Sequence, residues 1–248
     1  MKTDLFLAIH IISGLAIMGC NHDKDITPDV IIPKLKTEAY YYGIDTTPLF
    51  TVTYEYNEAS QLVLVKFLNN SYSVLEYDAD KVTIKSYDSK GIQSNSELIL
   101  NGKGLLQSGT WLQFGLNGTG YKYNADNYLI EKHYTSAYET DIYAGVISYT
   151  ITSGNTTSSA DRNDKYGILG TDINKYQFIL DKINTIGNEN RGLAFLGKSD
   201  KNLLEKWTTH RGANVYFEYE FDSKGRVTKP IELNTARIMG SSTYTYMD

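Results

Sequence analysis

The clearest pattern in this chain is the alternation of apolar and polar residues over short runs. Between residues 214 and 222, Val, Phe, Tyr and Phe at odd positions alternate with Tyr and Glu at even positions. Shorter runs around residues 82–87 and 146–151 alternate in the same way. One apolar face and one polar face are typical of strands in an antiparallel sheet. The pattern therefore predicts a mainly β, antiparallel protein.

One turn motif recurs six times between these runs. An aromatic or apolar residue is followed by Asx, by two or three small or polar residues, and then by another apolar residue. The Asx residues are Asn57, Asp78, Asp88, Asn101, Asn124 and Asp222. An Asx side chain can bond to the backbone two residues on, and Gly or Asn accepts the positive φ of a bulged hairpin. Six such hairpins predict a meander that forms a strongly curved sheet or an incomplete barrel.

Two segments near residues 173–207 depart from the strand pattern. In residues 199–207, Ser199 suits an N-cap, and Leu203, Leu204 and Trp207 share one side, which predicts a short helix. In residues 172–186, apolar residues recur at helical spacing, although residues 176–180 fit a strand equally well. We slightly favour a helix there. One or two short helices would then plug the open side of the sheet, with loops at 153–164 and 188–192.

The N-terminus carries a different signal. Residues 5–18 are mostly apolar, which suits a secretory signal and is shorter than the about 20 apolar residues of a membrane span. The sequence Ile17-Met18-Gly19-Cys20 resembles the lipobox of bacterial lipoproteins. The resemblance implies lipidation of Cys20, the only cysteine, and cleavage before it. We expect a signal peptide over residues 1–19, an extended tether over 20–36 and one antiparallel β domain over 37–248.

Composition and motifs narrow the function classes. A net charge of −5 without a basic cluster gives no electrostatic case for nucleic acid as a partner. One cysteine cannot form a redox pair, and His133 and His210 stand outside any metal-binding motif, so we expect no metal and no cofactor. No nucleophile elbow is present, and the sequence Gly115-Leu-Asn-Gly118-Thr-Gly120 precedes a strand, so it is interpreted as a turn. We therefore expect no enzymatic activity.

The Tyr-x-Tyr-Asn/Asp turns resemble the tyrosine–aspartate repeats of bacterial surface and toxin-shell proteins. Together with the lipobox and the segment at 197–204, they are more similar to a Bacteroidetes lipoprotein family of unknown function with a porin-like fold. The resemblance implies a location at the outer membrane and assigns no catalytic residues. Asp23 and Asp25, just after Cys20, resemble a surface-export signal, which favours the cell surface over the periplasm. Charged residues on the polar strand faces argue against a lipid-facing exterior.

Binding is the leading functional hypothesis. Exposed aromatic rings can stack on a ligand, and we select Trp111, Trp207 and Tyr216 as the ligand-stacking candidates. The ligand would be a glycan, a lipid or a protein partner at the cell envelope. Asp45-Thr46-Thr47 resembles an O-glycosylation acceptor of Bacteroidetes, with Thr46 as the modified residue. A structural role in outer-membrane assembly and a hydrolase with an unrecognised site remain the alternatives.

Overall fold

The structure of the protein, a computed structural model, describes residues 32–111, 116–138, 141–163, 170–234 and 237–247. Contacts divide the chain into two units, residues 1–31 and residues 32–248. The predicted signal peptide, the lipidation residue Cys20 and most of the predicted tether lie outside the described residues. The account below therefore concerns the second unit, whose first strand begins at Leu35, two residues before the predicted start of the domain.

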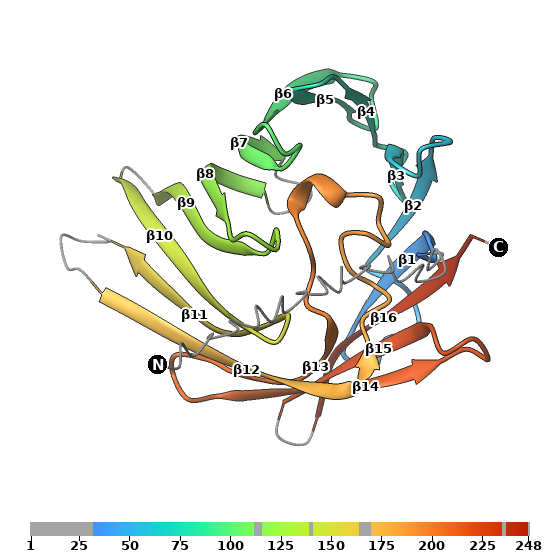
Figure 1. The fold of residues 1–248 in the computed structure, drawn as a ribbon. Coiled ribbons are helices and arrows are strands. Elements are labelled where there is room, and N and C mark those ends of the chain that lie inside the picture. Colours follow the sequence, from blue (N-terminus) through green and yellow to red (C-terminus); the bar gives the residue numbers. More distant parts are fainter. Residues whose placement is uncertain (1–31, 112–115, 139–140, 164–169, 235–236, 248) are drawn as a thin grey trace, which may run out of the picture. The chain divides into compact units, whose positions relative to one another are not determined.

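Sixteen strands in the described residues form one closed antiparallel barrel (Figure 1). The strands are β1 Leu35–Tyr42, β2 Phe50–Tyr56, β3 Leu62–Phe67, β4 Tyr72–Tyr77, β5 Lys81–Tyr87, β6 Gln93–Leu100, β7 Leu106–Trp111, β8 Leu116–Tyr123, β9 Leu129–Tyr138, β10 Asp141–Thr152, β11 Asn155–Asn163, β12 Gly170–Ile183, β13 Asn202–Thr208, β14 Asn214–Phe221, β15 Val227–Asn234 and β16 Arg237–Tyr246. Each strand pairs with its sequence neighbours, and β1 pairs with β16 to close the ring. The predicted meander is confirmed, and its sheet closes completely.

Five of the six predicted Asx turns have the expected geometry, and the turn at Asp78 is a shorter one closed by the bond from the Asp78 N–H to the Lys81 carbonyl. In the turn at residues 57–61, Asn57 Oδ1 accepts the backbone N–H of Gln61 at 2.9 Å, and Ser60 takes a positive φ of 60°. The turns that begin at Asp88, Asn101, Asn124 and Asp222 repeat this bond to the fifth residue. Their fourth residues, Gly91, Gly104, Asn127 and Gly225, also have positive φ. The side chain thus closes the turn, and the fourth residue reverses the chain.

The helix predictions near residues 173–207 are wrong. Residues 170–183 form β12, residues 202–208 form β13, and the predicted loop at 153–164 is mostly β11. The segment between β12 and β13 contains a single 3-10 turn, η3 Ala194–Leu196. Strand β12 has register breaks between Gln177 and Phe178 and between Ile179 and Ile183. These bulges shift apolar residues off the period of two and imitate helical spacing.

Apolar side chains point into the barrel, and charged ones point out. The core is made of inward residues from β1 to β8 and from the last strands, including Val65, Ile84 and Leu98, all fully buried. On the outer face, cross-strand ion pairs link neighbouring strands between residues that alternate with this core. The pairs are Lys66–Glu55, Lys85–Glu76, Lys81–Glu97, Lys122–Glu131 and Lys229–Glu220. The exterior of the barrel therefore has the charge pattern of a water-facing surface.

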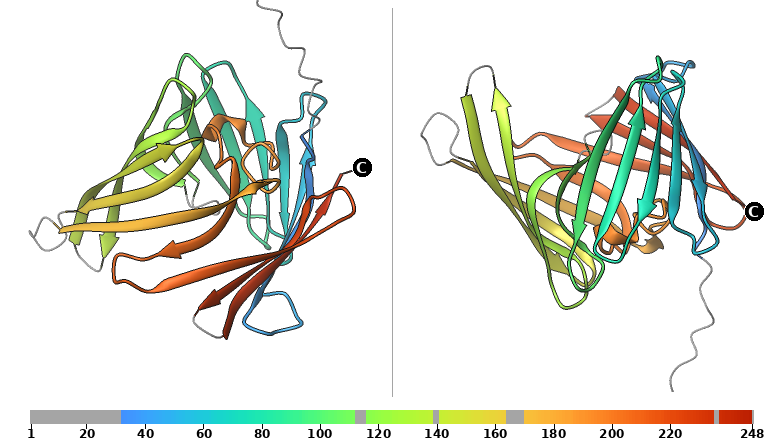
Figure 2. Two further views of the ribbon diagram at one scale, coloured as in Figure 1. Left: turned by 60° about the horizontal axis from the view of Figure 1, so that its bottom comes forward. Right: turned by 90° about the horizontal axis from the view of Figure 1, so that it is seen from above.

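Residues 184–201, which we call the plug, fold into the barrel and close one of its ends (Figures 1 and 2). Leu193 and Phe195 of the plug belong to the hydrophobic core. The plug donates and accepts backbone hydrogen bonds at β1, at β3 and at the turns at 124–128 and 152–155. All of these lie at the end that carries the start of β1 and the Asx turns at Asn57, Asn101, Asn124 and Asp222, which we call the plugged end. The opposite end is called the distal end.

A buried charge pair holds the plug to the barrel wall. Arg191 of the plug lies 3.2 Å from Glu38 of β1, and Arg191 also donates to the backbone carbonyl of Ile186. Glu38 accepts two further hydrogen bonds, from the Tyr54 hydroxyl at 2.8 Å and from the Tyr244 hydroxyl at 3.3 Å. Burial acts to lower the pKa of Arg191, but Glu38 and the two tyrosines raise it more, so the guanidinium stays charged.

Candidate functional site

The inward face of the barrel changes character around its circumference. Inward residues of β2 to β8 are mostly apolar and form the core. From β9 to β13 the inward positions become mostly polar and aromatic, with Ile147 between Lys132 and Asp161 as an exception, and most of these side chains other than the buried Ser159 are partly exposed. We call this set the inner wall, and it consists of Lys132, Tyr134, Tyr149, Ser159, Asp161, Asp172, Asn174, Tyr176 and Trp207. Packing alone would favour apolar residues here, so the inner wall is the candidate site.

Asn174 is the centre of the hydrogen-bond network on the inner wall. Its Oδ1 accepts the Trp207 indole N–H at 3.3 Å and the backbone N–H of His210 at 3.1 Å. These two donors fix the amide orientation, so Nδ2 faces Ser159 Oγ at 3.5 Å. Ser159 is in turn 2.9 Å from the Tyr176 hydroxyl. The network fixes the orientation of the Trp207 and Tyr176 side chains before any ligand arrives.

Two carboxylates lie opposite each other on the inner wall. Asp161 of β11 and Asp172 of β12 are cross-strand partners. Asp161 accepts the Tyr134 hydroxyl hydrogen bond at 2.8 Å, and the Asp172 side chain is 48% exposed. Burial lowers the pKa of the neighbouring Lys132, and the charge of Asp161 opposes this shift. Like charges directly opposite each other destabilise a sheet. Lys132 beside Asp161, and His210, whose Nε2 is 3.8 Å from Asp172 Oδ2, lie close to the pair and offset part of this cost.

The inner wall leads to a cavity of about 250 Å³ beneath the plug. Tyr149 belongs to both, and burial raises its pKa to about 12, so its hydroxyl remains protonated at neutral pH. The cavity is lined by tyrosines and aliphatic residues of β8 to β11 and by residues 196–200 of the plug. A second cavity of about 240 Å³ lies between β1, β14 to β16 and Ile186. The plug therefore leaves interior space on two sides of the barrel.

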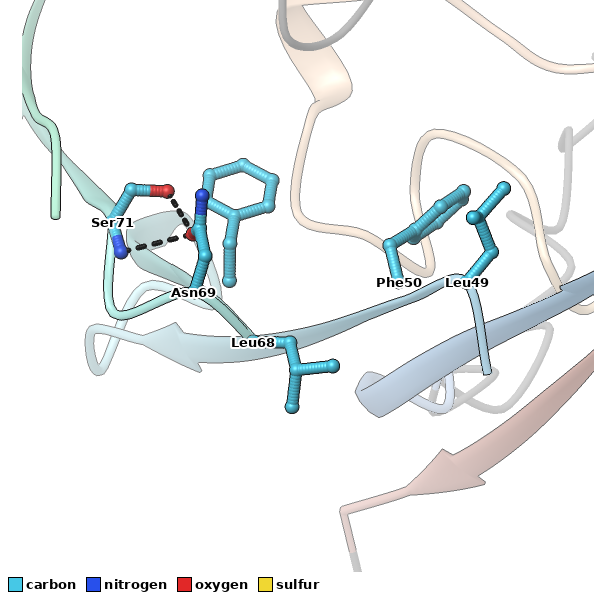
Figure 3. Close-up of a pocket in the computed structure, with 6 residues that line it drawn as sticks. Leu49, Phe50, Leu68, Asn69 and Ser71 are labelled. Carbon is cyan, nitrogen blue, oxygen red and sulfur yellow. Dashed lines mark hydrogen bonds between the residues drawn. The ribbon is translucent and has the colours of Figure 1, made fainter. Parts of the chain in front are cut away.

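A separate pocket of about 680 Å³ lies at the distal rim (Figure 3). Leu49 and Phe50 form one side and Leu68 the other, and their exposed fractions are 67%, 41% and 63%. Asn69 and Ser71 supply the polar part and are hydrogen bonded to each other. The pocket residues carry no formal charge. Such a surface suits an apolar group.

The residues predicted to stack on a ligand lie in three different environments. Trp111 is 1% exposed in the core, so its indole offers no free face to a ligand. Tyr216 lies on the outer face, where Lys206 Nζ is 5.6 Å from its ring centroid. Trp207 faces the lumen on the inner wall. Among the three residues, only Trp207 belongs to the candidate site.

Thr46 and the histidines occupy surface positions. Thr46 is exposed in the loop between β1 and β2, where a modifying enzyme can reach it. His133 lies on the outer face, with Nε2 2.5 Å from Glu131. His210 lies in the turn between β13 and β14 at the distal end, where its Nε2 is 3.8 Å from Asp172 Oδ2. Within the described residues, no group of three or more His, Cys, Asp or Glu is placed to hold a metal ion.

Sequence reasoning missed most of the inner wall. Tyr134, Asp161, Asn174 and Tyr176 were not predicted. Strands β9 and β11 carry polar residues on both faces, so alternation does not reveal which face is internal, and β12 was interpreted as a helix. The available signal was the spacing of Ser159 and Asp161 and of Asn174 and Tyr176, each two residues apart. That spacing becomes informative only once the segment is known to be a strand.

Comparisons with known proteins show the fold. A porin-like protein from Bacteroides uniformis has a TM-score of 0.52 at 15% sequence identity, and the match covers 86% of this chain and 96% of that chain. A porin-like protein from Bacteroides vulgatus matches with a TM-score of 0.45 at 11% identity, over 87% of this chain and 99% of that chain. No protein-family model matches the sequence, and no curated protein does. The porin-like fold implied by the sequence is confirmed.

Proposed function

We propose that this protein is a lipid-anchored binding protein of the bacterial outer membrane, exposed at the cell surface, whose barrel stays outside the bilayer and has no catalytic activity. The observation that carries the proposal is the charged exterior. A barrel that spans a membrane presents an apolar band to lipid, whereas here cross-strand ion pairs, such as Lys85–Glu76, lie on the outer faces of β2 to β6, β8 and β9, and β14 and β15. Among the described residues, no helix is long and apolar enough to cross a membrane. Cys20 is then the group that attaches the barrel to the membrane.

Binding is proposed to take place inside the barrel. The plug closes one end, and the inner wall remains only partly buried, so a ligand can reach it from the distal end. A lumen that is half filled by core and plug is unsuited to a through-channel, but it retains two cavities and an ordered polar surface. Glycan, lipid and protein ligands are the three classes that the sequence suggests.

Membrane partition tests the anchoring half of the proposal. Wild-type protein should pellet with membranes and enter a detergent phase. A Cys20→Ser variant whose residues 1–19 are replaced by a leader with a different cleavage site should be recovered in the aqueous phase without detergent. If this variant stays in the membrane pellet after alkaline extraction, the barrel itself is inserted and the proposal is wrong. Protease treatment of whole cells then distinguishes the surface from the periplasmic face.

Two observations favour the alternative functions. The apolar pocket at the distal rim, with Leu49, Phe50 and Leu68 exposed, would suit docking to another envelope protein, as an assembly role requires. The opposed carboxylates Asp161 and Asp172 are the group that a hydrolase would need. The first alternative is tested by isolating the envelope proteins that copurify with the wild-type protein. The Leu68→Asp variant is the control and should lose them. The second alternative is tested by incubating oligosaccharides with the protein and looking for shortened products by mass spectrometry.

A further inference from the structure

We propose that the inner wall of β9 to β13 binds a neutral oligosaccharide. This inference rests on the proposed binding function and names its ligand class and its site. The carrying observation is the juxtaposition of ordered aromatic rings with hydroxyl, amide and carboxylate groups on one inward surface. A sugar ring has apolar C–H faces and a rim of hydroxyl groups, so it requires both kinds of group at once.

The aromatic part of the inner wall is positioned in advance. Asn174 holds the Trp207 indole, and Ser159 contacts the Tyr176 hydroxyl, so both rings are constrained at their polar ends. Tyr134 is constrained by its bond to Asp161. Because the Trp207 and Tyr176 side chains are already ordered, stacking of a ligand on them would cost little conformational freedom. Neighbouring strands are about 4.8 Å apart, so the four intervals from β9 to β13 span about 19 Å, which accommodates several sugar rings.

The charges of the inner wall favour a neutral ligand. Asp161 and Asp172 are opposed across two strands, and among the inner-wall residues Lys132 is the only lysine or arginine. Two carboxylates accept hydrogen bonds from sugar hydroxyls and repel an anionic ligand. A bound sugar hydroxyl that donates a hydrogen bond to either carboxylate would reduce the repulsion between the two.

The two tryptophans provide an internal reporter for the test. Trp207 lies on the inner wall, whereas Trp111 is 1% exposed in the core. The full-length protein is titrated with a panel of neutral linear hexasaccharides of gluco, xylo, manno and galacto configuration, and quenching of its fluorescence by acrylamide is followed. At least one panel member should protect Trp207 from quenching. A Trp207→Phe variant, in which Trp111 is the remaining tryptophan, should show no protection.

Variants on the inner wall test where binding occurs. By calorimetry, Asn174→Ala and Asp161→Asn should weaken the affinity about tenfold or more, because each leaves a hydrogen-bonding group without its partner. Asp161→Asn removes the repulsion with Asp172 and also the attraction to Lys132, and it keeps an oxygen that can accept the Tyr134 hydroxyl, so we expect little change in Tm. A thermal melt of each variant measures this, and an unchanged Tm excludes a loss of folding as the cause of weaker binding. Tyr216→Ala on the outer face is the matched control and should bind as wild type does.

The outcomes separate this inference from the function on which it rests. If no neutral hexasaccharide protects Trp207, or if Asn174→Ala and Asp161→Asn bind as tightly as wild type, the oligosaccharide site is refuted, whatever the partition assay shows. Binding of acidic oligosaccharides in preference to neutral ones would also refute it. If a hexasaccharide binds but is recovered shortened, the site stands and the non-catalytic function is wrong.

Discussion

The charge pair between Glu38 and Arg191 should be the main attachment of the plug, and Glu38→Gln tests this. The substitution keeps the shape of the side chain and leaves the Arg191 guanidinium without its counter-charge. Breaking a fully buried pair costs about 3–5 kcal/mol. The Glu38 and Arg191 side chains are 16% and 22% exposed, so water screens part of the charge. We therefore expect a loss of about 2 kcal/mol in the free energy of unfolding.

Urea denaturation and thermal melting measure this loss directly. For a domain of this size, about 2 kcal/mol corresponds to a fall in Tm of about 4–8 °C. Arg191→Met and the double variant complete a double-mutant cycle, and the double variant should cost less than the sum of the two single variants. Glu76→Gln, which breaks an outer-face pair with Lys85, is the control and should leave the urea midpoint unchanged. A wild-type midpoint for Glu38→Gln, or strictly additive costs, would refute the reasoning.

Three further predictions concern the plug and the loops. Gly192→Ala should destabilise the protein more than Gly212→Ala, as measured by urea denaturation. Both glycines have positive φ, but a Cβ at Gly192 would meet Tyr56 Cε1 at 2.7 Å, whereas at Gly212 nothing lies within 4 Å; equal costs would contradict this. Burial raises the pKa of Asp200, so ionisation costs stability as the pH rises through that pKa. Asp200→Asn should therefore raise Tm at pH 7.5, and this gain should fade toward pH 4. A gain in Tm that does not depend on pH would show that ionisation of Asp200 is not its cause. Thr46→Ala should lower the intact mass by more than the side-chain difference if Thr46 is glycosylated, and a wild-type mass equal to the lipidated polypeptide would exclude the modification.

The hairpin architecture was predictable because its signals are local. An Asx residue and a positive-φ residue three positions later determine each turn within five residues, and the flanking alternation sets the strands. Closure of the barrel was not predictable in the same way. It depends on β1 meeting β16, a pairing between Leu35 and Tyr246 that no local pattern encodes. The sequence therefore predicted a curved sheet and left its closure open.

The helix predictions failed where tertiary pairing overrode a local pattern. Ser199 and the apolar residues that follow it resemble a capped helix, but residues 202–208 pair with β12 on one side and β14 on the other. Two ladders of hydrogen bonds, with Leu203 buried in the core, outweigh a weak helical preference. The filling role was predicted for two helices, but it belongs to residues 184–201, which include the correctly predicted loop at 188–192. The function of Ser199 is also different: its hydroxyl accepts the backbone N–H of Asn188 within the plug.

The connection between the plug and the start of β1 has a mechanical consequence. The Asn190 side chain donates to the carbonyl of Pro33, Lys34 Nζ donates to the carbonyl of Glu189, and the N–H of Leu35 donates to the carbonyl of Asn190. A pulling force that arrives along the chain before Pro33 therefore acts on these three bonds, and on the bond from the Met247 N–H to the Lys34 carbonyl, before it acts on the rest of the β1–β16 ladder. A force on the N-terminal segment would therefore act directly on the plug, whose residues line the two inner cavities.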